Sequence, residues 1–152
     1  MKENIKSFKR KTIEEEQQEI NQNKRYNELK DVMTLEEIKQ LEEWTDLPID
    51  SIVYDSNTEG IEKCGYEGSK FQNNILNKEN LIFYIESEEG DRFGYFMRNK
   101  LDNIGKYIAD KNGFLFNMKK NILKIDYKTS LGCFLVNYPQ TEELLQIMFC
   151  LG

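Results

Sequence analysis

Residues 81–97 read LIFYIESEEGDRFGYFM, and this segment gives the clearest indication of the fold. Its two arms are rich in the aromatic and β-branched residues that favour strands, and Gly90 lies between them. Glu88, Glu89 and Gly90 fit a three-residue loop, in which a type I turn is followed by a left-handed glycine. The segment therefore predicts a β-hairpin.

The three-residue loop also predicts which residues of the two arms lie opposite each other. The predicted pairs are Ser87–Asp91, Glu86–Arg92, Ile85–Phe93, Tyr84–Gly94, Phe83–Tyr95 and Leu81–Met97. One face of the hairpin is then apolar, and the other carries an opposite-charge pair and an aromatic ring over a glycine, each contributing roughly 0.2–1 kcal/mol. A two-residue loop would mix apolar and charged side chains, because a slip of one residue moves every side chain to the other face.

The composition describes a globular chain and excludes several classes of function. The chain has 152 residues, which suits one domain with a modest core; 39% are hydrophobic and 32% are charged. A net charge of -6 leaves no basic excess to neutralise phosphates, so neither a nucleic acid nor an anionic membrane is expected as a partner. There is no run of 18 apolar residues, so no membrane span is predicted.

The histidine and cysteine content excludes further chemistry and bears on localisation. The chain has no histidine, which excludes Ser-His-Asp catalysis, Cys-His catalysis and His-ligated zinc within it. Cys64, Cys133 and Cys150 match no metal-binding spacing, and their odd number favours reduced thiols over disulfides. The start, MKENIKSFKRK, lacks the apolar region of a secretory signal. We therefore expect a cytoplasmic protein with no metal and no cofactor.

Residues 1–33 are polar and dense in charge, which predicts a solvated helical extension. Ile13 and Ile20 have heptad spacing, but Asn27 and Thr34 follow them in the same register. Two interpretations stay open. The helix forms a weak coiled coil, through self-association or with a partner, or it is an extension without a partner.

Local signals predict the elements that follow. Thr34 and Glu37 form a capping box that opens a helix running to about Trp44. Residues 51–55, SIVYD, predict a short strand, and residues 55–60, DSNTEG, predict a turn. This turn resembles the first half of a calcium-binding loop but lacks the acidic twelfth residue, so no metal site is expected.

The second half of the chain predicts one more helix and four more strands. Ser69 and Gln72 form a capping box that opens a helix to about Asn77, and residues 101–111 form a connector with a helical turn at 104–107. The predicted strands are 113–118, 122–127, 131–138 and 144–150. In the second hairpin the predicted pairs are Met118–Leu123, Phe116–Ile125 and Phe114–Tyr127.

Strands at hairpin spacing, with the helices gathered before them, predict an antiparallel two-sheet β-sandwich with flanking helices. The predicted fold class is α+β, with strands making up most of the regular structure. We expect two parts, a helical extension over residues 1–33 and the sandwich over residues 34–152.

Five segments, in order and spacing, resemble the TLDc domain, the module of the oxidation-resistance proteins. They are LEEWT (41–45), IVYDSNTEG (52–60), SKFQNNIL (69–76), NKENLIFYIESEEGDRFGYF (77–96) and NGFLFNMKKN (112–121). The resemblance covers about residues 34–152. The chain departs from the family in having one glycine at Phe93-Gly94-Tyr95 where two are usual, and Asn57-Thr58-Glu59-Gly60 where many members have His and Gly. It ends at FCLG (149–152), where the family continues, so the domain is expected to be truncated or divergent at its C-terminus.

The resemblance implies two packed antiparallel sheets in a eukaryotic protein linked to oxidative-stress resistance, with binding to the vacuolar proton pump in several members. It brings no catalytic residue, so a non-enzymatic interaction module is expected. Asp55, Ser56 and Gly60 match the family's first turn and are candidate contact positions, although turn formation also explains them. The alternatives are a coiled-coil oligomerisation scaffold, or a small redox or hydrolytic enzyme that uses the thiols or a pair such as Asp55 and Glu59.

Overall fold

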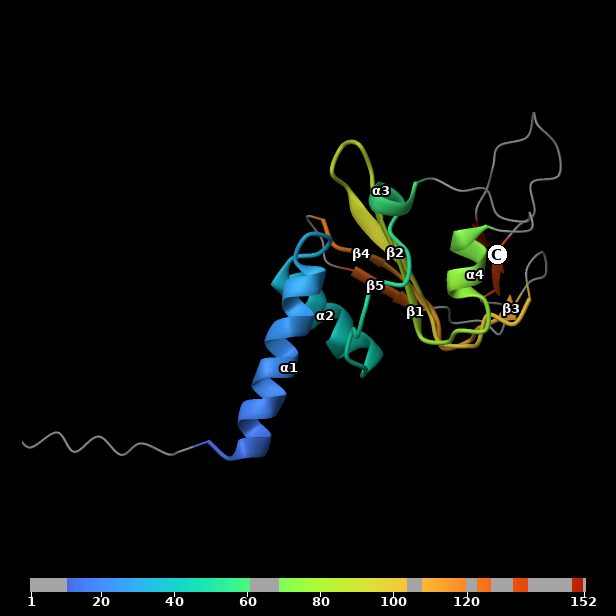
Figure 1. Ribbon diagram of the computed structural model, residues 1–152. Helices are drawn as coiled ribbons and strands as arrows, with labels where there is room; N and C mark the ends of the chain where they lie inside the picture. Colours follow the sequence, from blue (N-terminus) through green and yellow to red (C-terminus); the bar gives the residue numbers. More distant parts are fainter. Residues whose placement is uncertain are drawn as a thin grey trace, which may run out of the picture. The chain divides into compact units, whose positions relative to one another are not determined.

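The computed structural model describes residues 11–60, 69–103, 108–119, 123–126, 133–136 and 149–151. They form an α+β fold, drawn in Figure 1, and the chain divides into two compact units, Met1–Ile52 and Val53–Gly152. The first unit contains α1 (Ile13–Leu29) and α2 (Leu35–Thr45). The second contains α3 (Ser56–Glu59), α4 (Lys70–Ile75), β1 (Leu81–Glu86), β2 (Arg92–Met97), β3 (Ile108–Ala109), β4 (Phe114–Asn117), β5 (Leu123–Asp126), β6 (Cys133–Val136) and β7 (Phe149–Leu151). The predicted division between residues 33 and 34 stays a prediction.

Helix α2 begins and ends where the sequence predicts. The Oγ1 atom of Thr34 accepts from the backbone N–H of Glu37 at 3.3 Å, and Oε2 of Glu37 accepts from the N–H of Thr34 at 2.8 Å. The predicted capping box is therefore confirmed. Asp46, with φ 55°, takes the left-handed conformation that ends the helix after Thr45.

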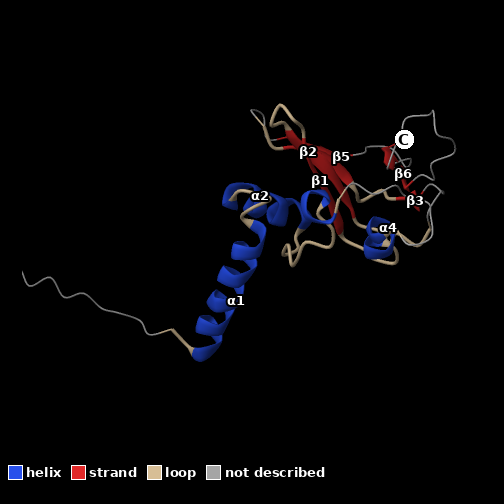
Figure 2. Ribbon diagram, turned by 45° about the horizontal axis from the view of Figure 1, so that its top comes forward, coloured by secondary structure: helices blue, strands red, loops and turns tan. Residues whose placement is uncertain are grey.

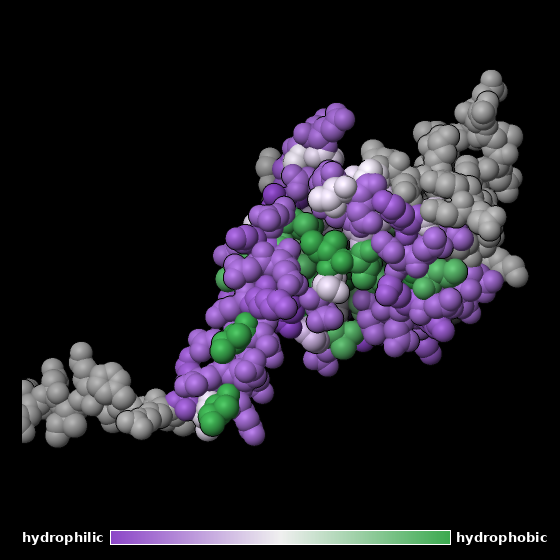
Figure 3. Space-filling model, viewed as in Figure 1, coloured by the Kyte–Doolittle hydropathy of each residue, from purple (hydrophilic) through white to green (hydrophobic). Residues whose placement is uncertain are grey.

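Helix α1 has a polar surface along most of its length. Ile13 is 85% exposed and Ile20 is 60% exposed, and Leu29 in the last turn is the buried residue of the helix. On the side shown in Figure 3, α1 is mainly hydrophilic with isolated apolar side chains. The helix predicted within residues 1–33 is present, whereas the coiled coil stays a prediction.

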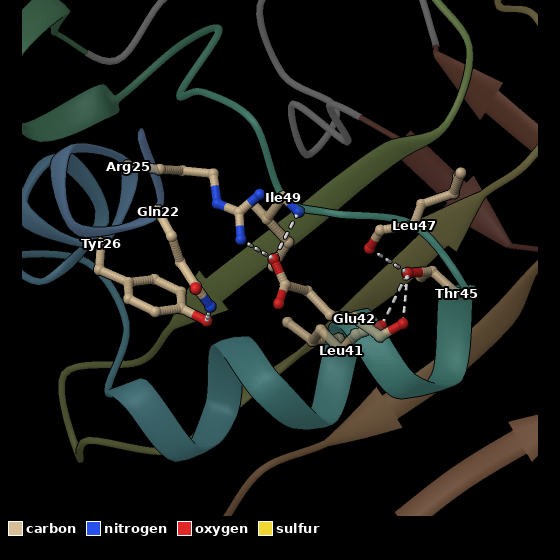
Figure 4. Close-up of polar contacts among 8 residues, drawn as sticks. All are labelled: Gln22, Arg25, Tyr26, Leu41, Glu42, Thr45, Leu47 and Ile49. Carbon is tan, nitrogen blue, oxygen red and sulfur yellow. Dashed lines mark hydrogen bonds and ion pairs between the residues drawn. The ribbon is translucent and has the colours of Figure 1, made fainter. Parts of the chain in front are cut away.

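One carboxylate oxygen joins three segments of the first unit (Figure 4). Oε1 of Glu42 in α2 lies 3.0 Å from Nη2 of Arg25 in α1 and accepts from the N–H of Ile49 at 3.0 Å. The side chains of Arg25 and Glu42 are 21% and 19% exposed, so the ion pair is largely shielded from water. Glu42 therefore connects α1, α2 and the segment that follows α2.

Replacing Glu42 by Ala is expected to lower the free energy of unfolding by about 2 kcal/mol, because the Arg25 guanidinium and the Ile49 N–H lose their shared acceptor. Urea denaturation followed by circular dichroism measures the loss. Glu43→Ala is the control, since Glu43 is exposed on the same helix. Equal losses in the two variants would contradict a structural role for the Glu42 carboxylate.

The first hairpin has the predicted register and loop. All the predicted pairs between β1 and β2 are present, including Phe83 with Tyr95 and Tyr84 with Gly94. The N–H of Ser87 donates to the carbonyl of Asp91 at 2.9 Å. Gly90 has φ 74°, the left-handed value that the sequence predicts.

β1 and β2 belong to a four-stranded antiparallel sheet with the order β1-β2-β4-β5, which is twisted in Figure 2. Helix α4 contributes to its core. The buried cluster consists of Phe71, Ile75, Leu81, Phe83, Tyr95, Met97 and Leu101. Since Leu81 and Met97 are opposite each other at the open end of the hairpin, α4 packs at the end of the sheet away from the hairpin loop.

The predicted register of the second hairpin is wrong by one residue. The observed pairs are Asn117–Leu123, Phe116–Lys124, Leu115–Ile125 and Phe114–Asp126. Oδ1 of Asn117 accepts from the N–H of Lys119 at 2.9 Å, so the loop begins one residue earlier than predicted and Met118 lies outside β4. Leu123 and Ile125 are therefore on the sheet face opposite to the one predicted.

Three further predictions need correction or lie beyond the described residues. Residues 51–55 form no strand, because the segment pairs with neither sheet. Residues 108–109 of the predicted connector form β3 in a three-stranded antiparallel sheet with the order β3-β6-β7. The helical turn predicted at 104–107 lies outside the described residues. Packing of the two sheets as a sandwich stays a prediction.

Candidate functional site

The predicted contact positions lie in one turn whose polar atoms are bonded locally. Asp55 is the N-cap of α3, and its Oδ1 atom accepts from the N–H of Asn57 at 2.9 Å. Oε1 of Glu59 accepts from the N–H of Asp55 at 3.3 Å. Gly60 has φ 86°, a left-handed value that favours glycine. The side chains of Asp55 and Glu59 thus serve the turn itself.

Tyr54 attaches this turn to the core of the second unit. The centroid of its ring lies 5.0 Å from that of the Phe71 ring in an edge-to-face arrangement, and its hydroxyl donates to the carbonyl of Gly60. Ser56 and Gly60 are exposed, whereas Asp55 is half-buried. The turn therefore presents its outer residues from a fixed support.

A buried carboxylate, which the sequence reasoning missed, organises the connection between β2 and β4. Asp110 is fully buried, and its Oδ2 atom accepts from the N–H of Arg98 at 2.6 Å. Its carbonyl accepts from the N–H of Gly113 at 3.1 Å, and Nδ2 of Asn99 donates to the carbonyl of Ala109 at 2.7 Å. The turn sequence Asp-Lys-Asn-Gly was the available signal, because Asp and Gly favour turns.

Charged groups connect the loop between β1 and β2 with the segment that follows β4, at the end of the sheet opposite to Asp110. Nζ of Lys119 lies 2.5 Å from Oδ1 of Asp91 and donates to the carbonyl of Glu89 at 3.3 Å. Nε of Arg92 lies 3.3 Å from Oε2 of Glu86, as the predicted pairing requires. These groups are partly exposed, so they orient the two loops more than they stabilise the fold.

Three large apolar side chains are exposed near this end, and we call them the β5 patch. Phe93 in β2 is 39% exposed, and Leu123 and Ile125 in β5 are 50% and 48% exposed. The register places all three on the face that carries Phe83 and Tyr95. Helix α4 packs on the other end of this face. Exposed apolar side chains that share one sheet face are suited to contact with another protein.

The described residues place two of the three cysteines. Cys133 is opposite Ala109, and Cys150 is opposite Leu135, so the register does not pair one cysteine with the other. Cys64 lies outside the described residues. Within the described part of the chain, no group of three or more His, Cys, Asp or Glu residues is arranged to hold a metal ion.

Among the residues that the structure describes, no helix has the length and apolar character needed to cross a membrane. A search of curated proteins and a search of solved structures found no match to the chain. The family model of the TLDc domain matches residues 14–144, which is most of the 152 residues and includes all but the first residue of helix α1. The chain therefore belongs to the TLDc domain family.

Proposed function

We propose that the chain is a non-enzymatic, cytoplasmic protein-interaction module that is linked to oxidative-stress resistance or binds the vacuolar proton pump, and we take pump binding as the testable form. The observation that carries the proposal is the TLDc match over residues 14–144. The absence of histidine supports it, because general acid–base and nucleophilic catalysis use histidine most often. In this proposal the two antiparallel sheets pack as a sandwich.

We assign the contact with the pump to the turn of Asp55, Ser56 and Gly60. The hydrogen bonds within the turn and the packing of Tyr54 on Phe71 support this assignment. A loop held in one conformation before binding loses little entropy when the partner docks. Exposed loop positions on a folded support are also where binding residues concentrate.

Replacing Ser56 by Arg is expected to weaken binding to the pump by about tenfold, because a long charged side chain at a central contact displaces the partner. Biolayer interferometry with immobilised, detergent-solubilised pump measures the dissociation constant. Ser51→Arg is the matched control, since both serines are exposed. Absence of wild-type binding would rule out the pump as partner. Equal binding of the two variants would rule out the turn as the contact.

A scaffold function is the second proposal, and the exposure of Ile13 and Ile20 supports it. The two isoleucines are seven residues apart, so they lie on the same side of α1 and suit a short coiled-coil seam. Deleting residues 1–33 would be a poor test, because it would also remove Arg25 and its contact with Glu42. Ile20→Lys removes the seam and leaves that contact intact.

A further inference from the structure

Strand β5 is the last strand in the order β1-β2-β4-β5. Within the described residues, β5 has a neighbouring strand on one side, β4, and none on the other. An edge strand of this kind presents backbone N–H and C=O groups that can pair with another strand. The same strand carries the side chains of Leu123 and Ile125, which are both half-exposed.

We propose that β5 pairs antiparallel with β5 of a second copy of this chain, so that the two four-stranded sheets join into one. The pairing centres on Ile125, which lies opposite Ile125 of the second copy. The two-fold axis that relates the two copies is perpendicular to the sheet, so the β5 patches of both copies lie on the same face and adjoin. The contact is isologous, which limits the assembly to a dimer.

The charges of β5 select this register over the others. Pairing centred on Ile125 places Lys124 of each copy opposite Asp126 of the other, which gives two opposite-charge pairs. Pairing centred on Lys124 places two lysines opposite each other, which is unfavourable. A register shifted by one residue would place Lys124 of one copy opposite Ile125 of the other. Apolar and charged side chains would then share a face, so the alternation of apolar and charged residues in β5 excludes it.

The charge order of β5, with Lys124 and Asp126 on either side of Ile125, favours a second copy over an arbitrary strand. Nζ of Lys124 lies 4.5 Å from the ring centroid of Phe114, so the lysine is held on the face away from the β5 patch. A lysine at a sheet edge normally discourages pairing, but here the aspartate two residues away provides its complement. β5 is only four residues long. Stable interfaces bury about 1,200 Å² or more, so we expect a weak, concentration-dependent dimer.

Sedimentation velocity of the full chain over a range of concentrations tests the proposal. We expect the average mass to rise with concentration from 18.1 kDa toward twice that value. Ile125→Lys should hold the mass at 18.1 kDa, because it places two like charges at the centre of the pairing. A wild-type mass that stays at 18.1 kDa at every concentration would overturn the proposal.

A charge-exchange series makes the test independent of simple unfolding. Lys124→Asp and Asp126→Lys should each weaken the dimer by about tenfold, because each converts two attractive pairs into two repulsive ones. The double variant Lys124→Asp with Asp126→Lys restores opposite charges and should return the dissociation constant to within about threefold of wild type. Raising the salt concentration should reduce these differences. A double variant as weak as the single variants would overturn the register.

Two controls separate this dimer from the functions proposed above. Ile20→Lys should leave the dimer unchanged. If instead Ile20→Lys dissociated the dimer while Ile125→Lys still dimerised, the contact would be assigned to α1 and the proposal would be overturned. Pump binding by Ile125→Lys should equal that of wild type. An Ile125→Lys variant that dimerises but no longer binds the pump would assign the β5 patch to that partner, again overturning the proposal.

Discussion

Replacing Gly94 by Ala is expected to lower the free energy of unfolding by about 3–5 kcal/mol, a large part of the stability of a domain this size. A Cβ atom at this position would lie 1.9 Å from the carbonyl oxygen of Phe83 and 2.5 Å from Cζ of Phe116. The first of these atoms belongs to the backbone of β1, so relief would require separating β1 from β2. The close approach of the strands therefore depends on the missing side chain.

The register explains why Gly94 occupies this position. Gly94 lies between Tyr84 on β1 and Phe116 on β4, in one row across three strands. The two rings have centroids 6.4 Å apart, so they come together above the glycine. This arrangement extends the predicted covering of Gly94 by Tyr84, because a second aromatic ring takes part.

Urea denaturation of Gly94→Ala beside Gly90→Ala separates steric overlap from backbone strain. At Gly90 a Cβ would meet no atom within 4 Å, but φ is 74°. We expect a loss of about 1–2 kcal/mol at Gly90, the cost of the left-handed conformation for alanine. A loss at Gly94 equal to or smaller than the loss at Gly90 would contradict the close approach of the strands.

Replacing Gly113 by Ala is expected to cost about 2–3 kcal/mol. A Cβ there would lie 2.1 Å from the hydroxyl oxygen of Tyr95 and 2.8 Å from Oδ2 of Asp110. Both side chains are buried, and Oδ2 of Asp110 accepts from the N–H of Arg98, so neither atom moves without losing packing or a hydrogen bond. The shift in the midpoint of thermal unfolding measures the cost.

A double-mutant cycle with Tyr95→Phe identifies the source of this loss. Tyr95→Phe removes the oxygen nearest to the new methyl group, so the double variant should lose less stability than the two single losses predict. We expect a coupling of about 1 kcal/mol. Strict additivity would show that the hydroxyl of Tyr95 does not cause the loss at Gly113.

Local signals account for the parts of the fold that the sequence predicted correctly. The first hairpin depends on a three-residue loop and on alternation within its arms, and these agree on one register. The capping box of α2 depends on two residues three positions apart. Both are formed by neighbours in the chain, so no knowledge of distant contacts is required.

The predicted register of the second hairpin was wrong because the alternation of apolar residues in its two strands allows two registers with comparable apolar faces. The hydrogen bond from the N–H of Lys119 to Asn117 lengthens the loop, and the N–H of Met118 donates to the carbonyl of Arg92 on β2. The second contact joins strands separated by the connector, which alternation within the hairpin does not report. The resulting shift leaves Leu123 and Ile125 half-exposed and creates the β5 patch.

The candidate sites divide in the same way. The turn of Asp55, Ser56 and Gly60 was predictable because turn residues follow one another in the chain, whereas its role as a contact stays a prediction. Asp110 and Glu42 were not, because each carboxylate bonds to a backbone N–H seven to twelve residues away. The amino-acid order thus determined the capping box of α2, the first hairpin and the family. Packing between segments distant in the chain decided which carboxylates are buried and, among the described residues, which strand is last in the four-stranded sheet, because burial and pairing depend on neighbours that only the folded chain brings together.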